Sequence, residues 1–215
     1  TATQTAAPKA GRRPRGADGT APLSREGVIA CAVRLARTEP ITELSMVRVA
    51  RELGVAPGLV HYYVGSQNDL LSTVLNVTFK ERCEALPPMT GRWQDDLAGI
   101  ARSTVAATER WPGLGVYIMT RSRLRLFQRV GPGETDHGLV YFDRVGRVLK
   151  ASGFPSDKAA MVYHTLMLFV VNIAVDRENR QAPAVHKDFI RRYVGQFDPE
   201  DVPGAAFLVQ PFSEI

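Results

Sequence analysis

Cysteine is scarce in this 215-residue chain, and the two that occur, Cys31 and Cys83, lie far apart in the sequence. Two widely spaced cysteines cannot form a disulfide framework, and they suit a protein of the reducing cytoplasm. The four histidines are scattered, so the sequence also lacks the ligand spacing of a zinc site. We therefore expect no metal, no cofactor and a cytoplasmic location.

Signatures of catalysis, secretion and membrane insertion are also missing. The chain contains no H-E-x-x-H, no P-loop and no G-x-S-x-G. Residues 131–138 hold two glycines of a dinucleotide loop, but Asp136 replaces the third and no strand precedes them. No apolar run opens the chain, so we expect no secretion signal. The longest apolar stretch, residues 159–175, is interrupted by polar residues and is too short for a membrane span. We expect neither an enzyme nor a membrane protein.

Charge is distributed unevenly along the chain, whose formal net charge is +5. Residues 1–82 carry 11 Lys/Arg against 7 Asp/Glu, whereas residues 83–215 carry 16 against 15. An excess of positive charge at one end is what attraction to nucleic-acid phosphates requires. The charge pattern favours a nucleic-acid-binding N-terminal part.

Residues 44–63, LSMVRVARELGVAPGLVHYY, form the motif around which the chain is organised. Ser45 can cap a short helix, and Gly54 follows it where a left-handed residue is favoured. Pro57 then suits the first turn of a second short helix, because its missing N–H is not needed there. Ala50 is small enough for the two helices to approach closely. This pattern predicts a helix-turn-helix, a DNA-reading unit.

The segment from Leu23 to about Phe79 resembles the DNA-binding domain of the tetracycline-repressor (TetR) family. In that family the recognition helix ends in aromatic residues, and a Ser-capped helix with a Ser-x-x-acid box and Leu-Leu follows. The residues that match this pattern are Tyr62, Tyr63, Ser66, Asp69, Leu70 and Leu71. Three positions depart from it: His61 replaces a Tyr, Leu59 a Thr or Ser, and Gln67 a basic residue.

The motif and the resemblance together give a set of expected DNA contacts. Backbone N–H groups and a guanidinium at the start of the motif's first helix can hold phosphate. The outer face of the second helix can approach bases, although a histidine beside aromatic residues can also be purely structural. The basic arm, residues 1–22, would lie in the minor groove or remain a solvated tail. The expected DNA-binding residues are Arg12, Arg13, Arg15, Arg25, Ser45, Arg48, Pro57, Gly58, His61, Tyr62, Tyr63 and Gln67; Arg25 rests on the resemblance alone.

The whole chain is expected to be all-α, with three parts. They are a flexible basic arm (1–22), a helix-turn-helix domain with its linking helix (23–88), and a helical ligand-binding and dimerisation domain (89–215). The stretch 156–177 is apolar on all sides, so it should be buried against both its own core and a partner subunit. We expect it to form a homodimer interface with residues 137–152, as a four-helix bundle. The TetR resemblance points the same way.

The C-terminal part also offers candidates for a small-molecule pocket. Mostly apolar linings with a few polar groups are typical of such sites, although the same residues could simply fill the core. His164 and Asn172 are eight residues apart, which places them on nearly one helix face. The expected ligand-binding residues are Trp111, Tyr117, Met119, Phe127, Tyr163, His164, Met167 and Asn172.

We interpret the chain as a DNA-binding transcriptional regulator, a repressor that a small apolar or aromatic molecule releases from its double-stranded operator. One alternative is a regulator without a small-molecule ligand, which would show a filled core. Another is a helical enzyme or small-molecule-binding protein whose helix-turn-helix is only structural. The residues do not reveal the ligand, the operator or the sign of regulation.

Overall fold

The computed structural model describes residues 23–120 and 126–215, and every regular element in these two ranges is a helix. This confirms the all-α fold class. Arg12, Arg13 and Arg15, expected to contact DNA, lie outside the described residues. The helices are α1 (Arg25–Thr38), η1 (Ile41–Glu43), α2 (Met46–Leu53), α3 (Pro57–Val64), α4 (Gln67–Glu84), α5 (Trp93–Glu109), α6 (Leu114–Thr120), α7 (His137–Ala151), α8 (Ser156–Glu178), η2 (Pro183–His186), α9 (Lys187–Val194) and α10 (Pro203–Phe212).

Side-chain caps fix where the first helices begin, as the sequence predicts. The hydroxyl of Ser24 accepts from Gly27 N–H, and that of Ser45 accepts from Arg48 N–H. Ser66 and Asp69 form a complete capping box at the start of α4. Each cap satisfies backbone donors that a helix start leaves without an intrahelical acceptor. These local contacts set the first residues of α1, α2 and α4.

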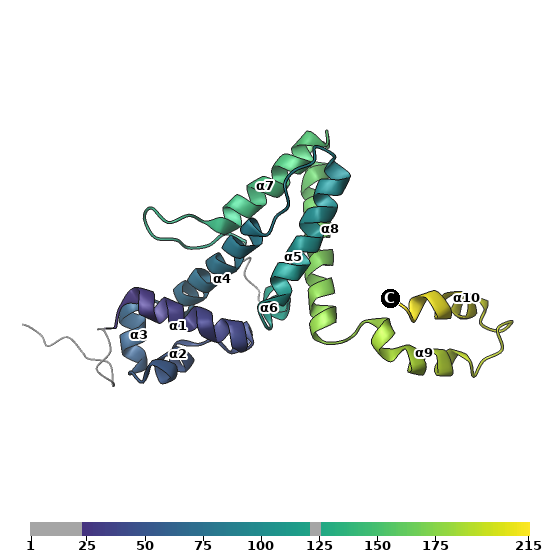
Figure 1. Ribbon diagram of the computed structural model, residues 1–215, viewed down its shortest axis with the longest axis horizontal. Coiled ribbons are helices and arrows are strands. Elements are labelled where there is room, and N and C mark those ends of the chain that lie inside the picture. Colours follow the sequence, from purple (N-terminus) through teal and green to yellow (C-terminus); the bar gives the residue numbers. More distant parts are fainter. Residues whose placement is uncertain (1–22, 121–125) are drawn as a thin grey trace, which may run out of the picture.

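Helix α4 belongs to two hydrophobic cores. Its first half contributes Leu70 and Val74 to a cluster with α1, α2 and α3. Phe79, further along α4, packs in a second cluster with Ile100 of α5 and Tyr141 of α7. In Figure 1, α4 runs from the helix-turn-helix up to α7. A rigid helix buried at both ends can transmit a displacement from one cluster to the other.

Helix α8 is less buried than the sequence predicts. Only Val170 and Ala174 are fully buried along its length, while Met161, Leu168 and Phe169 are at least half exposed. Burial on all sides is therefore not achieved within one chain. Length and composition alone would also let the segment Ser156–Val194 cross a membrane, contrary to the expectation from residues 159–175. A single apolar helix of this kind is equally typical of an interface between soluble subunits.

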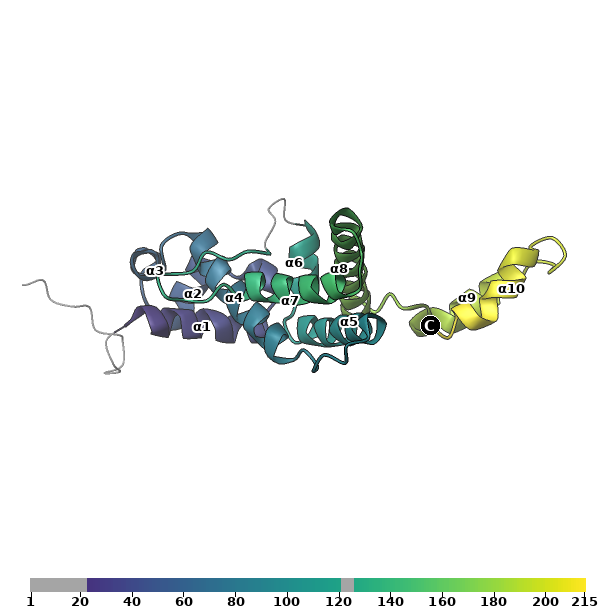
Figure 2. The same cartoon turned by 90° about the horizontal axis from the view of Figure 1, so that it is seen from above.

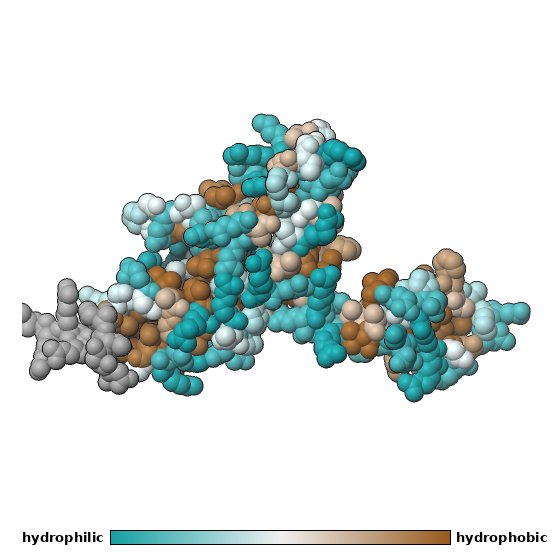
Figure 3. Space-filling model, in the orientation of Figure 1, coloured by the Kyte–Doolittle hydropathy of each residue, from teal (hydrophilic) through white to brown (hydrophobic). Residues whose placement is uncertain are grey.

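The C-terminal residues form an arm that projects away from the helical body. Figures 1 and 2 both show α9 and α10 folded against each other at a distance from α5 and α8. Figure 3 shows hydrophobic surface on this arm. Phe189, Tyr193 and Phe207 are each more than half exposed.

Candidate nucleic-acid interface and effector groove

Helix α3 presents one face to the core and the opposite face to solvent. Val60 is completely buried, whereas Tyr62 is 79% exposed and His61 is also exposed. Pro57 and Gly58 are exposed in its first turn, and a Cβ added at Gly58 would meet nothing within 4 Å. Tyr63 is half-buried, and its ring packs edge-on against Tyr62 at 5.2 Å. An open helix face with aromatic and imidazole groups suits entry into a major groove.

The turn between α2 and α3 has the predicted geometry. Gly54 adopts a left-handed conformation, with φ of 65°, which a glycine accommodates without steric cost. Val55 N–H then donates to Ala50 C=O at 3.0 Å, and Ala50 is buried between the helices. These contacts hold α3 against α2 and direct its outer face toward solvent.

His61 is oriented toward the end of its own helix. Its Nδ1 lies within hydrogen-bond distance of Gly65 C=O, four residues on. Gly65 has a φ of 79°, and a Cβ there would meet the Asp69 carboxylate at 2.9 Å. The ring's other nitrogen remains on the exposed side. His61 therefore combines a structural contact with an exposed position.

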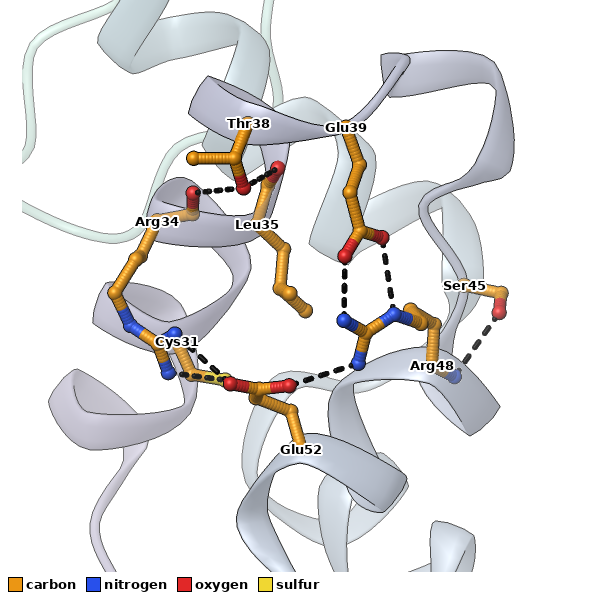
Figure 4. Close-up of polar contacts among 8 residues, drawn as sticks. All are labelled: Cys31, Arg34, Leu35, Thr38, Glu39, Ser45, Arg48 and Glu52. Carbon is orange, nitrogen blue, oxygen red and sulfur yellow. Dashed lines mark hydrogen bonds and ion pairs between the residues drawn. The ribbon is translucent and has the colours of Figure 1, made fainter.

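Arg48 is not free to bind a phosphate in this structure. Its Nε donates to Glu39 at 2.9 Å and its Nη1 to Glu52 at 3.0 Å, while Arg34 donates to the other oxygen of Glu52 (Figure 4). Glu39 and Glu52 accordingly raise the pKa of Arg48, and Arg34 and Arg48 lower the pKa of Glu52. The cation links α2 to the end of α1, so a phosphate contact by Arg48 would require it to give up these ion pairs.

Gln67 is also placed differently from the expectation. Its Oε1 accepts from Met46 N–H and its Nε2 donates to Leu44 C=O, both at 2.9 Å. Both the oxygen and the nitrogen of the amide therefore bond protein groups, so neither atom is free to contact a phosphate. The side chain forms a bidentate clamp between the start of α4 and the start of α2. The resemblance alone could not reveal this clamp, because the N–H and the C=O that bond the Gln67 amide both belong to the backbone.

Other cations of the N-terminal part differ in their availability. Arg25 is exposed at the start of α1, but its guanidinium pairs with Glu134 at 3.3 Å. The Ser45 hydroxyl already accepts a hydrogen bond from Arg48 N–H as the cap of α2. Arg51, in the last turn of α2, is exposed and makes no ion pair with any residue the structure describes. The sequence reasoning did not select Arg51, although a basic residue beside the motif's glycine turn is a visible signal.

The eight residues expected to bind a ligand do not come together. Trp111 and Tyr117 are buried in the N-terminal cluster, where the Trp111 indole donates to Glu81 of α4 and stacks under the Arg37 guanidinium of α1. They join the two parts of the chain instead of lining a pocket. Tyr163 and Met167 pack against the second cluster. Met119, Phe127, His164 and Asn172 are exposed, and the Asn172 amide donates to Leu168 C=O in its own helix.

An open groove of about 810 Å³ lies instead between α5 and α8. Its walls are apolar, and none of the eight expected residues lines it. The residues that form it include Val105, Met161, Leu166, Phe169 and Ile173, with the exposed Arg102 and Arg177 also present. No local pattern in the sequence predicts this groove, because it depends on how two helices far apart in the chain are spaced.

This architecture defines a class of protein with two helical domains, of which the N-terminal one contains a helix-turn-helix. Residues 87–192 match the family model described as the C-terminal domain of tetracycline-repressor-like proteins. The chain belongs to the TetR family. The HTH-type transcriptional repressor DrrR1 of Streptomyces coeruleorubidus is 36% identical over 105 residues, which cover 48% of this chain and 38% of that protein. The match therefore spans well under two thirds of DrrR1.

Solved structures support the fold. Apo ActR of Streptomyces coelicolor has a TM-score of 0.73 at 23% identity, covering 91% of this chain and 88% of its own. ActR has also been solved in complex with actinorhodin. BioQ with its double-stranded DNA operator has a TM-score of 0.55 at 19% identity, covering 90% of this chain and 99% of its own. Because the sequence identities are 23% and 19%, this similarity supports the fold alone.

Proposed function

We propose that the protein is a homodimeric transcriptional repressor of the cytoplasm that binds a double-stranded operator and leaves it when a small molecule binds. The observation that carries the proposal is the open outer face of α3, with Tyr62 79% exposed beside His61 while Val60 is fully buried. Helix α3 would enter the major groove through this face, with Pro57 and Gly58 allowing close approach. DrrR1, a relative by sequence, is named as a repressor, and BioQ binds its operator DNA.

Uncovered apolar surface outside the groove supports the dimer. Helix α8 exposes Leu168, and α7 exposes Leu139 and Phe142. Contiguous apolar surface of this kind marks a protein interface. A two-fold partner packed on α7 and α8 would cover it and would present two copies of α3 to successive major grooves, about 34 Å apart. The apolar C-terminal arm adds a second surface that a partner subunit can cover.

Contacts between the two parts of the chain support a ligand response. The Gln67 clamp ties α4 to α2, and Trp111 connects α4 to α1 through Glu81 and Arg37. Ile41 N–H donates to Pro112 C=O, and Gly113 N–H donates to Glu178 at the end of α8. A ligand that shifts α8 or α4 would thus move the helix-turn-helix, and a change in α3 separation would lose one half-site. The ligand must prefer the non-binding state for this to work.

The proposal is tested by footprinting purified full-length protein on DNA fragments from around its own gene. The expected result is one protected inverted repeat whose half-sites are one helical turn, or a multiple of it, apart. Replacing both His61 and Tyr62 by alanine should abolish protection and lower the melting temperature only slightly, because both side chains are exposed and lose just the contacts to Gly65 C=O and to the Tyr63 ring. Uniform protection of random DNA, or equal protection by the double variant, would contradict the proposal.

A further inference from the structure

Arg82, on the last turn of α4, is a buried cation without an anionic partner. The residue is 5% exposed, and its Nη2 donates to the Thr108 hydroxyl at 3.1 Å. Its Nε has no hydrogen-bond acceptor, and no carboxylate pairs with it within residues 23–120 and 126–215. Its neighbours on α4 are engaged elsewhere: Glu81 binds Arg37 and Trp111, and Glu84 faces Lys80.

The charge on Arg82 persists despite its burial. Burial lowers the pKa of its guanidinium, yet an arginine remains protonated in proteins at physiological pH. An uncompensated charge in a protein core is unfavourable, and it is normally found with a counter-ion. The rings of Phe79 and Tyr141, at 4.8 and 5.6 Å from the guanidinium carbon, offset only part of this cost. The core therefore holds a cation whose matching anion is not supplied by any residue that the structure describes.

The surroundings of Arg82 suit a flat aromatic molecule. Phe79 and Tyr141 offer ring faces, and Met167 accepts a hydrogen bond from the Tyr141 hydroxyl at 3.6 Å. Tyr163 is half-buried beside the same cluster, and burial raises its pKa, so it stays a neutral hydrogen-bond donor. Aromatic pairs favour edge or offset stacking, and thioethers pack well against rings.

The groove between α5 and α8 gives a route to this position. Val105 lines the groove, and its neighbours on α5 face inward: Thr104 bonds the Tyr141 hydroxyl at 2.7 Å and Thr108 bonds Arg82. Val162 and Leu166 line the groove and also pack against the cluster that contains Phe79 and Tyr141. Side chains of the groove lining thus also pack against the cluster that surrounds Arg82, and a parting of α8 from α5 would connect the groove with that cluster.

We propose that Arg82 is the anchor for the carboxylate of an aromatic acid that enters between α5 and α8 and acts as the effector. The inference rests on the proposed function and names its ligand class. The guanidinium would donate through its free Nε to the carboxylate, while the rings of Phe79, Tyr141 and Tyr163 enclose the aromatic part. Because Arg82 is on α4, which Gln67 clamps to the helix-turn-helix, the ligand would pull directly on the helix that both cores share.

The test compares 2-naphthylacetic acid with its neutral amide, 2-naphthylacetamide, by calorimetric titration of the full-length protein. The acid should bind wild-type protein at least about tenfold more tightly, because a charge-assisted bond to a buried guanidinium is lost in the amide. Arg82→Met should remove this difference. Arg110→Met, which changes an exposed arginine at the end of α5 that does not line the groove, should retain it and serves as the matched control.

A second measurement requires no ligand. Arg82→Met should melt at the same temperature as wild type or higher, because it removes a buried charge without a partner. A clearly lower melting temperature would show that Arg82 is structural and would overturn the inference. So would equal binding of acid and amide to wild-type protein, including no binding of either, or loss of the difference in Arg110→Met.

Operator binding is measured separately, so the two proposals can fail independently. If the protein binds the acid more tightly than the amide through Arg82 but prefers no DNA fragment, the repressor proposal is refuted and the anion-site proposal stands. Protein that binds its operator but does not discriminate would refute the anion site alone.

Discussion

Gln67 was expected to contact a DNA phosphate, but in the structure its amide bonds two backbone groups of the protein. Replacing Gln67 with alanine tests which of these two roles the side chain has. The variant loses two hydrogen bonds, to Leu44 C=O and Met46 N–H, both at 2.9 Å. At about 1 kcal/mol for each bond, the free energy of unfolding should fall by about 2 kcal/mol. For a chain of this size that corresponds to a melting temperature about 4–8 °C lower.

The assay pairs thermal unfolding with the affinity for DNA. A hydrogen bond from the uncharged Gln67 amide to a phosphate would contribute about 1 kcal/mol, so its loss would weaken DNA binding about fivefold. We expect Gln67→Ala to lower the melting temperature and leave the affinity unchanged at temperatures well below the transition. Gln94→Ala, which alters an exposed glutamine in the first turn of α5, is the control and should change neither. An unchanged melting temperature with weaker DNA binding would refute the clamp.

Three further predictions concern the helix-turn-helix and its supports. Arg48→Met should lower the melting temperature more than Arg51→Met does, because Arg48 bridges Glu39 and Glu52, and circular dichroism of the two variants checks this; equal melting would contradict it. Gly113→Ala should reduce the free energy of unfolding by about 1–3 kcal/mol, because its φ is 69° and the new Cβ would lie 3.1 Å from Pro40, and urea titration measures the loss; an unchanged midpoint would contradict it. The Ser66 hydrogen bonds lower the pKa of Asp69, so the stability that wild type has over Asp69→Asn should be constant above about pH 5 and decline as the pH falls below about 4; an advantage that grows with acid would contradict it.

The elements with local determinants were predictable from the sequence. Ser45, Gly54 and Ser66 act through hydrogen bonds or backbone conformations within a few residues, so the bounds of α2, α3 and α4 follow from short-range rules. The apolar spacing of residues 137–151 likewise indicates a helix without reference to the rest of the chain. These features depend on residues that are close in the sequence, so they can be predicted without knowing the tertiary packing.

The site residues were less predictable because their roles depend on distant partners. Arg48 lies nine residues from Glu39 in sequence, and Trp111 lies thirty from Glu81, so neither ion pair nor hydrogen bond appears in a local pattern. The groove between α5 and α8 is defined by the distance between these helices, which composition does not encode. The apolar α8 was correctly identified as a helix, but its exposed face becomes visible only when the chain is folded. The domain boundaries and the DNA contacts of α3 remain predictions.

The most direct test of the central claim is a competition measured by fluorescence anisotropy on a labelled fragment from upstream of the gene. Wild-type protein should prefer this fragment over random DNA of equal length by at least about a thousandfold at physiological salt, and the preference should vanish in the His61→Ala/Tyr62→Ala variant. Equal affinity for both DNAs, or an undiminished preference in the variant, would contradict sequence reading by the open face of α3.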